Sequence, residues 1–271
     1  MNGLRSGESF NQTGTAARMS ETLAIVLAAG KGTRMKSDLP KVLVRVRGRA
    51  MIHYVIDALR DGGVDRIVVV VGYRAELVEQ ELQGADDVTF VSQTEQLGTG
   101  HAVKVCASEI SRQSGAVLIV TGDSPLIQVS SVRALLDMYE HDRPACILGT
   151  ADKADPSGLG RIVRDADNNF TGIVEEKDAA DAERRITEVN MSTYVFDSPE
   201  LIDALEQIKN DNLQGEYYLT DAPGILKAAH KDVRALTVLQ PCEALSINNM
   251  EDLAVVEAEM EKLGYERAEN I

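Results

Sequence analysis

Continuous apolar segments alternate with segments of helical spacing along most of the chain. Residues 23–29 form an apolar run followed by a glycine, which is typical of a strand buried on both faces of a sheet. Ile52, Val55, Ile56 and Leu59 then recur on one helical face and predict an amphipathic helix. Strand–helix units of this kind predict a mostly parallel sheet with helices on both faces.

The same two patterns continue through residue 149 and then change. They predict strands at 67–71, 88–91, 116–121 and 146–149, and helices near 74–83, 101–112 and 132–139. Beyond this point the strand-like segments 160–164, 170–175 and 189–196 appear, with no helix between the first two. This change of rhythm predicts a mixed or antiparallel extension of the same sheet.

No low-complexity linker divides the chain. Helices are expected near 199–209 and 253–263, which carries the folded region close to the C-terminus. We expect one domain over residues 21–264, preceded by a disordered polar tail, 1–20, and followed by a short C-terminal tail, 265–271.

Composition narrows the class of protein. The chain has 271 residues, 44% of them hydrophobic and 26% charged, which is ordinary for a globular protein with a sizeable core. No apolar run approaches the roughly 20 residues of a membrane helix, and the N-terminus lacks the apolar core of a signal peptide, so a cytoplasmic location without membrane attachment is expected. A net charge of −15 argues against binding to nucleic acid.

The negative charge is unevenly distributed. Residues 31–49 contain seven lysines and arginines and a single aspartate. A basic segment in an acidic protein is typical either of a site for a small polyanion or of a solvated basic face. Charge alone leaves both interpretations open.

A glycine-rich turn, 30–35, follows the first predicted strand inside this basic segment. It is not a dinucleotide fingerprint, because Met35 stands at the third glycine position, and it does not match a Walker A loop. Backbone N–H groups in such a turn can approach phosphate oxygens, with Arg34 and Lys41 adding charge. The alternative is a purely structural turn.

Asp123 directly follows the predicted strand 116–121 and its glycine. In an open α/β sheet, ligands bind at the carboxyl ends of the strands. A carboxylate there suits Mg²⁺, which takes one or two protein oxygens together with substrate phosphates. The alternative is a turn aspartate before Pro125.

Several further segments are polar where a strand or helix begins or ends. They are 93–101, 175–178, Asn190, 214–221 and Asn248-Asn249. Each of them alone has a structural explanation, such as a helix N-cap for the asparagine pair.

Taken in order, these segments resemble one family. Leu27-Ala-Ala-Gly-Lys-Gly-Thr-Arg-Met35 with Leu39-Pro-Lys41 resembles the signature of the nucleoside-diphosphate-sugar pyrophosphorylases. The segments 93–102, Gly122-Asp123, 158–162, 173–178, 214–218 and Asn248-Asn249 are similar to the uridyltransferase domain of the bacterial bifunctional N-acetylglucosamine-1-phosphate uridyltransferases. The resemblance covers about residues 22–263.

The resemblance implies a Rossmann-like nucleotidyltransferase fold of the α/β class, with a mostly parallel mixed sheet flanked by helices. It implies an enzyme that transfers uridylyl from UTP to N-acetylglucosamine 1-phosphate and releases pyrophosphate, with Mg²⁺ as cofactor. The residues it implies are Arg34, Lys41 and Asp123 for catalysis; Leu27, Ala28, Ala29, Gly30, Gln93, Gly98, Thr99, Thr121 and Gly122 for the nucleotide; Gly160, Glu175, Asn190 and Tyr218 for the sugar; and Asp123 with Asn248 for the metal.

The chain also departs from the family. Met191 and Ser192 follow Asn190 where the family usually has Thr or Ser and then Gly, and Thr121 stands where an aromatic is frequent. No hexapeptide repeats of a β-helix acetyltransferase domain are present, so that domain is not expected. Two alternatives stay open: a pyrophosphorylase for another sugar 1-phosphate, such as glucose 1-phosphate, and a non-catalytic nucleotide-sugar sensor. The sequence leaves the oligomeric state open.

Overall fold

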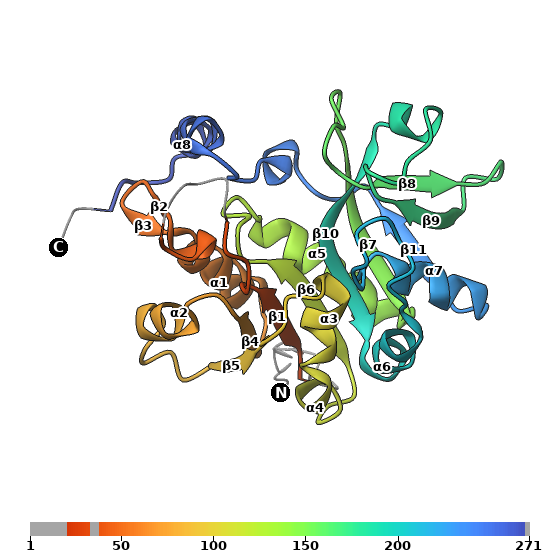
Figure 1. The fold of residues 1–271 in the computed structure, drawn as a ribbon, viewed down its shortest axis with the longest axis horizontal. Helices are drawn as coiled ribbons and strands as arrows, with labels where there is room; N and C mark the ends of the chain where they lie inside the picture. Colours follow the sequence, from red (N-terminus) through yellow and green to blue (C-terminus); the bar gives the residue numbers. More distant parts are fainter. Residues whose placement is uncertain (1–20, 33–37, 269–271) are drawn as a thin grey trace, which may run out of the picture.

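A computed structural model describes residues 21–32 and 38–268, and the expected disordered tail at 1–20 lies outside these ranges (Figure 1). Within them the chain forms a nine-stranded sheet whose main path runs in the order β11-β7-β10-β6-β1-β4-β5. The strands of this path are β1 (Leu23–Leu27), β4 (Arg66–Val71), β5 (Val88–Ser92), β6 (Ala116–Thr121), β7 (Cys146–Asp152), β10 (Glu188–Asp197) and β11 (Val233–Leu236). A hairpin of β8 (Arg161–Arg164) and β9 (Phe170–Val174) pairs with β10.

Helices cover both faces of the sheet, as the sequence predicts. One face packs against α1 (Met51–Gly62), α2 (Ala75–Glu81) and α5 (Val129–Asp142). The other packs against α3 (Thr99–Lys104), α4 (Ala107–Ile110), α6 (Ser198–Gln207) and α7 (Asp221–Ala228). Neighbouring residues of β1 alternate between the two cores, so both of its faces are buried and its sequence is continuously apolar.

The helix α1 illustrates how closely local sequence predicts an element. Its four residues at helical spacing, Ile52 to Leu59, are fully buried against the sheet. The helix ends at Gly62, and Gly63 follows with a φ of 96°, a left-handed conformation that glycine adopts without strain. The backbone N–H of Gly63 donates to the Arg60 carbonyl at 3.0 Å and closes the last turn.

The expected mixed extension of the sheet is confirmed, and its strand β10 lies antiparallel between β6 and β7 rather than at an edge. One expectation about the helices is wrong in detail. The segment 101–112 is two short helices rather than one, since the N–H of Cys106 donates to the Val103 carbonyl at 2.9 Å, a tighter turn than the α-helical one. The spacing of apolar residues continues unchanged across this turn, so the sequence pattern predicts one uninterrupted helix. The helix α7 and the edge strand β11 were not expected.

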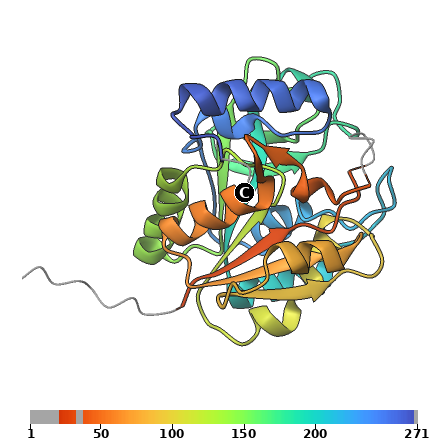
Figure 2. The same ribbon diagram turned by 90° about the vertical axis from the view of Figure 1, so that its left-hand side faces the viewer.

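The C-terminal part folds back over the top of α1. The helix α8 (Met250–Lys262) packs against the small β2–β3 hairpin (Arg45–Val46 and Arg49–Ala50), on the side that Figure 2 turns toward the viewer. Residues 265–268 continue along α1, and the ring of Tyr265 meets Tyr54 edge-on at 5.9 Å. The N–H of Ala268 donates to the Arg47 carbonyl at 2.9 Å.

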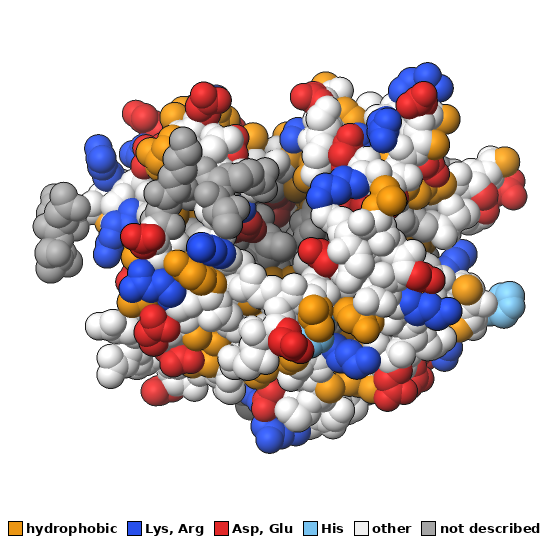
Figure 3. Space-filling view, viewed as in Figure 1, with side chains coloured by type: hydrophobic (Ala, Val, Ile, Leu, Met, Phe, Trp, Pro, Cys, Tyr) orange, Lys and Arg blue, Asp and Glu red, His pale blue; other side chains and the backbone are white. Residues whose placement is uncertain are grey.

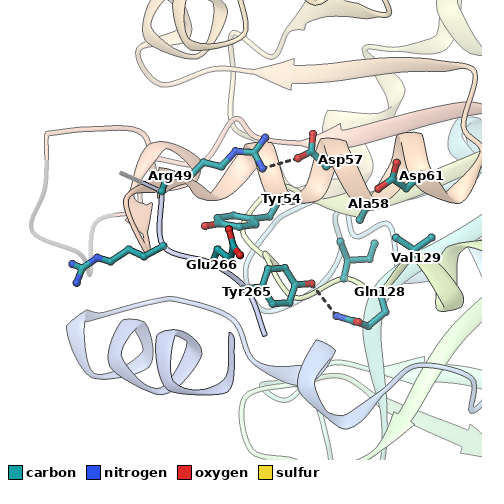
Figure 4. Close-up of a pocket in the computed structure, with 12 residues that line it drawn as sticks. Arg49, Tyr54, Asp57, Ala58, Asp61, Gln128, Val129, Tyr265 and Glu266 are labelled. Atoms are coloured by element: carbon teal, nitrogen blue, oxygen red, sulfur yellow. Dashed lines mark hydrogen bonds and ion pairs between the residues drawn. The ribbon is translucent and has the colours of Figure 1, made fainter. Parts of the chain in front are cut away.

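This return of the chain borders an open cavity of about 660 Å³ between α1 and the C-terminal segment. Figure 4 shows Arg49 paired with Asp57 on one wall and Gln128 reaching the Tyr265 hydroxyl on the other. None of the predicted catalytic, nucleotide-binding, sugar-binding or metal-binding residues lines this cavity. It marks where the C-terminal segment attaches to α1.

The expected site lies at the carboxyl ends of the parallel strands. The chain runs from β1 outward to β4 and β5 and then returns to β6 on the other side of β1, so the strand order reverses between β1 and β6. This reversal opens a crevice in which α/β sheets bind ligands. Figure 3 shows the surface notched there, between the α8 side and the β8–β9 side.

Candidate active site

Three predicted residues from distant parts of the chain meet at this crevice. Lys41 starts the short 3₁₀ helix Lys41–Leu43, Asp123 follows β6, and Asn248 precedes α8. The Lys41 ammonium contacts Asp123 Oδ2 and donates to Asn248 Oδ1 at 2.8 Å. The side chains of Lys41 and Asp123 are 14% and 25% exposed, so the charges are partly shielded from water. A carboxylate and an amide oxygen thus converge on one cation.

Glycines make this convergence possible. At Gly32, which has a φ of 64°, an added Cβ would lie 2.7 Å from Lys41 Cβ, so only glycine lets Lys41 pack against the turn. Next to Asp123, the N–H of Gly122 donates to the Leu27 carbonyl at 2.9 Å and ties the end of β6 to the end of β1. The glycine-rich turn is therefore structural at Gly32, as well as open to a ligand at Gly30, where an added Cβ would meet nothing within 4 Å.

The two asparagines before α8 divide the two roles that the sequence left open. The Asn249 side chain caps the helix, accepting from the N–H groups of Glu251 and Asp252 at 2.8 and 2.9 Å. The Asn248 side chain instead turns its carbonyl oxygen toward Lys41. The capping interpretation is correct for Asn249, and Asn248 is left to face the crevice.

The donor set at this point fits Mg²⁺. Asp123 Oδ2 and Asn248 Oδ1 both already bind the same positive group, and both are hard oxygen ligands. Among the described residues there is no group of three or more His, Cys, Asp or Glu side chains arranged to hold a metal. A metal here would therefore complete its shell with substrate oxygens and water, which is how Mg²⁺ usually binds beside phosphates.

A second predicted group lines a pocket of about 260 Å³ on the other side of β1. Its lining includes six predicted nucleotide-binding residues: Leu27, Ala29, Gly30, Gln93, Gly98 and Thr99. Three others lie elsewhere in this part of the structure. Ala28 donates its N–H to the Val70 carbonyl at 2.9 Å, and the Thr121 hydroxyl bonds to Ser124 at 2.9 Å, while Gly122 joins the two strand ends. Their roles toward a nucleotide remain predictions.

The pocket is built by two segments more than a hundred residues apart. At Gly98, with a φ of 107°, an added Cβ would lie 2.5 Å from the Tyr217 carbonyl oxygen. The N–H of Gly100 donates to that same carbonyl at 2.7 Å, and the N–H of Tyr217 donates to the Leu97 carbonyl at 2.8 Å. The polar segments 93–101 and 214–221 are therefore two sides of one structure.

This contact predicts a large effect of a small substitution. Gly98→Ala should lower the free energy of unfolding by about 2 kcal/mol more than Gly84→Ala, measured by urea denaturation. Gly84 is the control, because its φ of 87° is also positive while its added Cβ meets nothing within 4 Å. Equal losses of stability in the two variants would show that the Tyr217 contact is not tight.

A third predicted group, expected to contact the sugar, gathers around Glu175 and Asn190. The N–H of Asn190 donates to the Gly160 carbonyl at 2.8 Å, and an added Cβ at Gly160 would lie 3.6 Å from Glu175 Oε2. The Glu175 carboxylate accepts from the Thr220 hydroxyl at 2.9 Å through its other oxygen. Burial raises the pKa of Glu175, because it removes water from around the carboxylate. The hydroxyl groups of a ligand could donate hydrogen bonds to the carboxylate in place of that water. Tyr218, two residues before Thr220, is buried and its hydroxyl accepts from Gln214 at 2.5 Å.

The structure refines the role of Asn190. Its Oδ1 accepts from the Tyr194 hydroxyl at 2.8 Å and from the Ser192 N–H at 3.2 Å. The amide oxygen is therefore engaged within the protein, which leaves Nδ2 as the group for a ligand. Ser192 has a φ of 52°, in the left-handed region that favours glycine, and it stands where the resemblance leads one to expect glycine.

Some residues at the site were not predicted. Gln96 donates to the Ala29 carbonyl at 2.8 Å, and an added Cβ at Gly72 would meet Ala29 at 2.9 Å, so both shape the turn after β1. Glu243 is buried and accepts from the N–H groups of Gln240 and Gln128 at 2.6 and 3.0 Å. It thereby ties the chain that leads to Asn248 to the start of α5. Nothing in the sequence distinguishes the buried Glu243 from an exposed glutamate, so its role could not be predicted. Gln96 lies within the polar segment 93–101 and could have been singled out there. Arg34 lies outside the described residues.

Comparison with known proteins agrees with this geometry. The model of the MobA-like NTP transferase domain family matches residues 24–228, which run from β1 through α7. The chain belongs to this family. The resemblance proposed from the sequence motifs is thus confirmed.

Among relatives, this NTP transferase is similar to two proteins named bifunctional protein GlmU. It is 46% identical to the one from Streptococcus agalactiae over 237 residues, which cover 88% of this chain and 51% of that protein. It is 46% identical to the one from an Exiguobacterium species over 247 residues, 91% of this chain and 54% of that protein. The chain spans about half the length of the curated relatives it matches.

A solved structure confirms the expected fold. A UDP-glucose pyrophosphorylase complexed with UDP-glucose superposes with a TM-score of 0.74, covering 90% of this chain and 99% of that chain at 16% identity. At this identity the likeness shows a shared nucleotidyltransferase fold. Within the described residues, no helix of this NTP transferase is long and apolar enough to cross a membrane.

Proposed function

We propose that the chain transfers uridylyl from UTP to N-acetylglucosamine 1-phosphate and releases pyrophosphate. The observation that carries this proposal is the meeting of Lys41, Asp123 and Asn248 at the end of β6. In the sheet, β6 lies between β1, which borders the 260 Å³ pocket, and β10, which carries Asn190. A cation-binding point between this pocket and the polar side chain of Asn190 suits a nucleotide whose phosphates must meet a sugar phosphate. A cytoplasmic location belongs to the same proposal.

The reaction needs charge neutralisation more than proton transfer. A sugar phosphate has its second pKa near 6 and is largely a dianion at neutral pH, so it attacks without a general base. The obstacle is the repulsion between two polyanions around the α-phosphorus, which alignment and positive charge overcome. Lys41 is held at the crevice to supply such a charge.

The remaining groups bind and orient. Asp123 and Asn248 would hold Mg²⁺, which, when bound, neutralises phosphate charge. The open backbone at Gly30 leaves room for a nucleotide to approach β1. Glu175 offers an acceptor to sugar hydroxyls, and Asn190 Nδ2 offers a donor suited to the carbonyl oxygen of an N-acetyl group.

The test is pyrophosphate release from UTP with three sugar phosphates. We expect kcat/KM for N-acetylglucosamine 1-phosphate to exceed that for glucose 1-phosphate or glucosamine 1-phosphate by orders of magnitude, because a site built to pair with a substrate group rejects analogues without it. Equal values for the glucose and N-acetylglucosamine phosphates would favour a glucose-1-phosphate pyrophosphorylase. Binding of UTP without any pyrophosphate release would favour a nucleotide-sugar sensor.

A variant locates the N-acetyl contact. Asn190→Asp keeps the oxygen that accepts from Tyr194 and Ser192 but replaces the Nδ2 donor, so kcat/KM for N-acetylglucosamine 1-phosphate should fall about 10- to 100-fold. The value for glucose 1-phosphate should fall less. Tyr194→Phe is the control, since it removes the internal partner and leaves Nδ2 in place. A uniform loss for both sugars in Asn190→Asp would place the N-acetyl contact on another residue.

A further inference from the structure

The Gln93 side chain is fixed by two groups of the segment that follows it. Its Nε2 atom lies 3.1 Å from the Gly98 carbonyl oxygen and 3.1 Å from His101 Nδ1. The residue is 4% exposed, so these contacts largely determine how its amide is oriented. Gln93 also lines the 260 Å³ pocket, where a nucleotide base is proposed to bind.

The chemistry of the partners fixes the direction of each hydrogen bond. A backbone carbonyl only accepts, so the Gln93 atom that faces Gly98 must be the NH₂ group. The second hydrogen of that NH₂ group then points to His101 Nδ1, which must accept it. In this arrangement Nδ1 is the acceptor nitrogen of the imidazole, and Nε2 is its N–H donor.

With both amide hydrogens engaged, Gln93 keeps one hydrogen-bonding atom for a ligand. Gln93 Oε1 forms no hydrogen bond with a described residue. It is not fully buried either, so a ligand can reach it. Oε1 is an acceptor only. Uracil presents an N3–H donor on its Watson–Crick edge, whereas cytosine presents a bare N3 acceptor there, so this acceptor can pair with uracil and repels cytosine.

We propose that His101 is a positioning residue that holds the Gln93 amide in the orientation selecting uracil over cytosine. If the imidazole did not accept at Nδ1, one of the two restraints on the NH₂ group would be lost. The Gly98 carbonyl would then hold the amide alone, so the turned orientation, which presents a donor to the base and suits cytosine, would be disfavoured by one contact instead of two. The inference deepens the proposed uridylyl transfer and rests on it for the identity of the pocket.

The test compares UTP with CTP on the same variants. His101→Leu removes the acceptor, whereas His101→Asn keeps an acceptor at the corresponding δ1 position. Lys104→Ala, at an exposed position of the same helix, is the control for changes to α3. We would measure kcat/KM by pyrophosphate release and the dissociation constants of both nucleotides by isothermal titration calorimetry.

We expect His101→Leu to lower kcat/KM for UTP about tenfold and the UTP-to-CTP ratio by a similar factor, the size of one hydrogen bond's net contribution. His101→Asn and Lys104→Ala should keep the ratio within about threefold of the unmodified protein. A general loss of folding would lower both nucleotides equally and leave the ratio unchanged, so the ratio separates positioning from stability.

An unchanged ratio in His101→Leu, with UTP still used, overturns the inference and leaves the proposed function standing. An unmodified protein that binds UTP and CTP equally also overturns it. If calorimetry shows a uridine preference that His101→Leu abolishes while no pyrophosphate is released, the inference holds and the proposed function fails.

Discussion

Asp123→Asn is expected to lower kcat for pyrophosphate release by about 10³-fold or more while the protein remains folded. Asparagine has nearly the shape of aspartate, so the packing at the end of β6 should survive. The lost charge, however, removes the anion that faces the Lys41 ammonium and that would hold Mg²⁺. Turnover should be measured at saturating substrates, with thermal unfolding as the check on the fold.

A second readout separates the metal role from a general loss of activity. Mn²⁺ can replace Mg²⁺ as a spectroscopic probe, and Asp123→Asn should bind it much more weakly than the unmodified protein does. Asp86→Asn, an exposed aspartate away from the crevice, is the matched control and should change neither property. Unchanged Mn²⁺ affinity in Asp123→Asn would refute the metal role.

Lys41→Met should lower kcat by about 10²-fold or more and change KM little, as expected for a charge that acts mainly in the transition state. Methionine keeps much of the length and the apolar packing against Gly32 but carries no charge. A rise in KM with unchanged kcat would assign Lys41 to ground-state binding instead. Lys262→Met is the control, since that lysine is 72% exposed at the end of α8.

The same variant has a second expected property. The Lys41 ammonium occupies the oxygens of Asp123 and Asn248 that a metal would use, so lysine and metal compete in the free protein. Without nucleotide, Lys41→Met should therefore bind Mn²⁺ more tightly than the unmodified protein. Weaker binding would mean that Lys41 supports the metal ligands rather than competing with them.

The sequence by itself determined those strands and helices in which the order of apolar and polar residues shows which faces are buried. β1, β4 and β6 are continuous apolar runs because both of their faces contact helices, and α1 is an amphipathic stripe closed by a glycine pair. The motif segments were also recognisable, because together and in order they resemble the motifs of one family, although each alone has a structural explanation. The fold class and the family followed from these features.

The neighbours of each element were decided only by the tertiary structure. Apolar periodicity shows that a strand is buried but not which strands flank it, so the insertion of β10 between β6 and β7 could not be predicted. Likewise, Lys41 and Asn248 are 207 residues apart, and nothing local to either residue records that they share a hydrogen bond.

Tertiary contacts also decided which atom of each polar side chain is left for a ligand. Asn190 and Gln93 each have a donor and an acceptor, and the sequence shows both without showing which one the protein itself uses. The Tyr194 hydroxyl takes the oxygen of Asn190, while the Gly98 carbonyl and His101 take the nitrogen of Gln93. Hydrogen bonds are directional and short, so the free atom depends on partners that only the folded chain brings within about 3 Å.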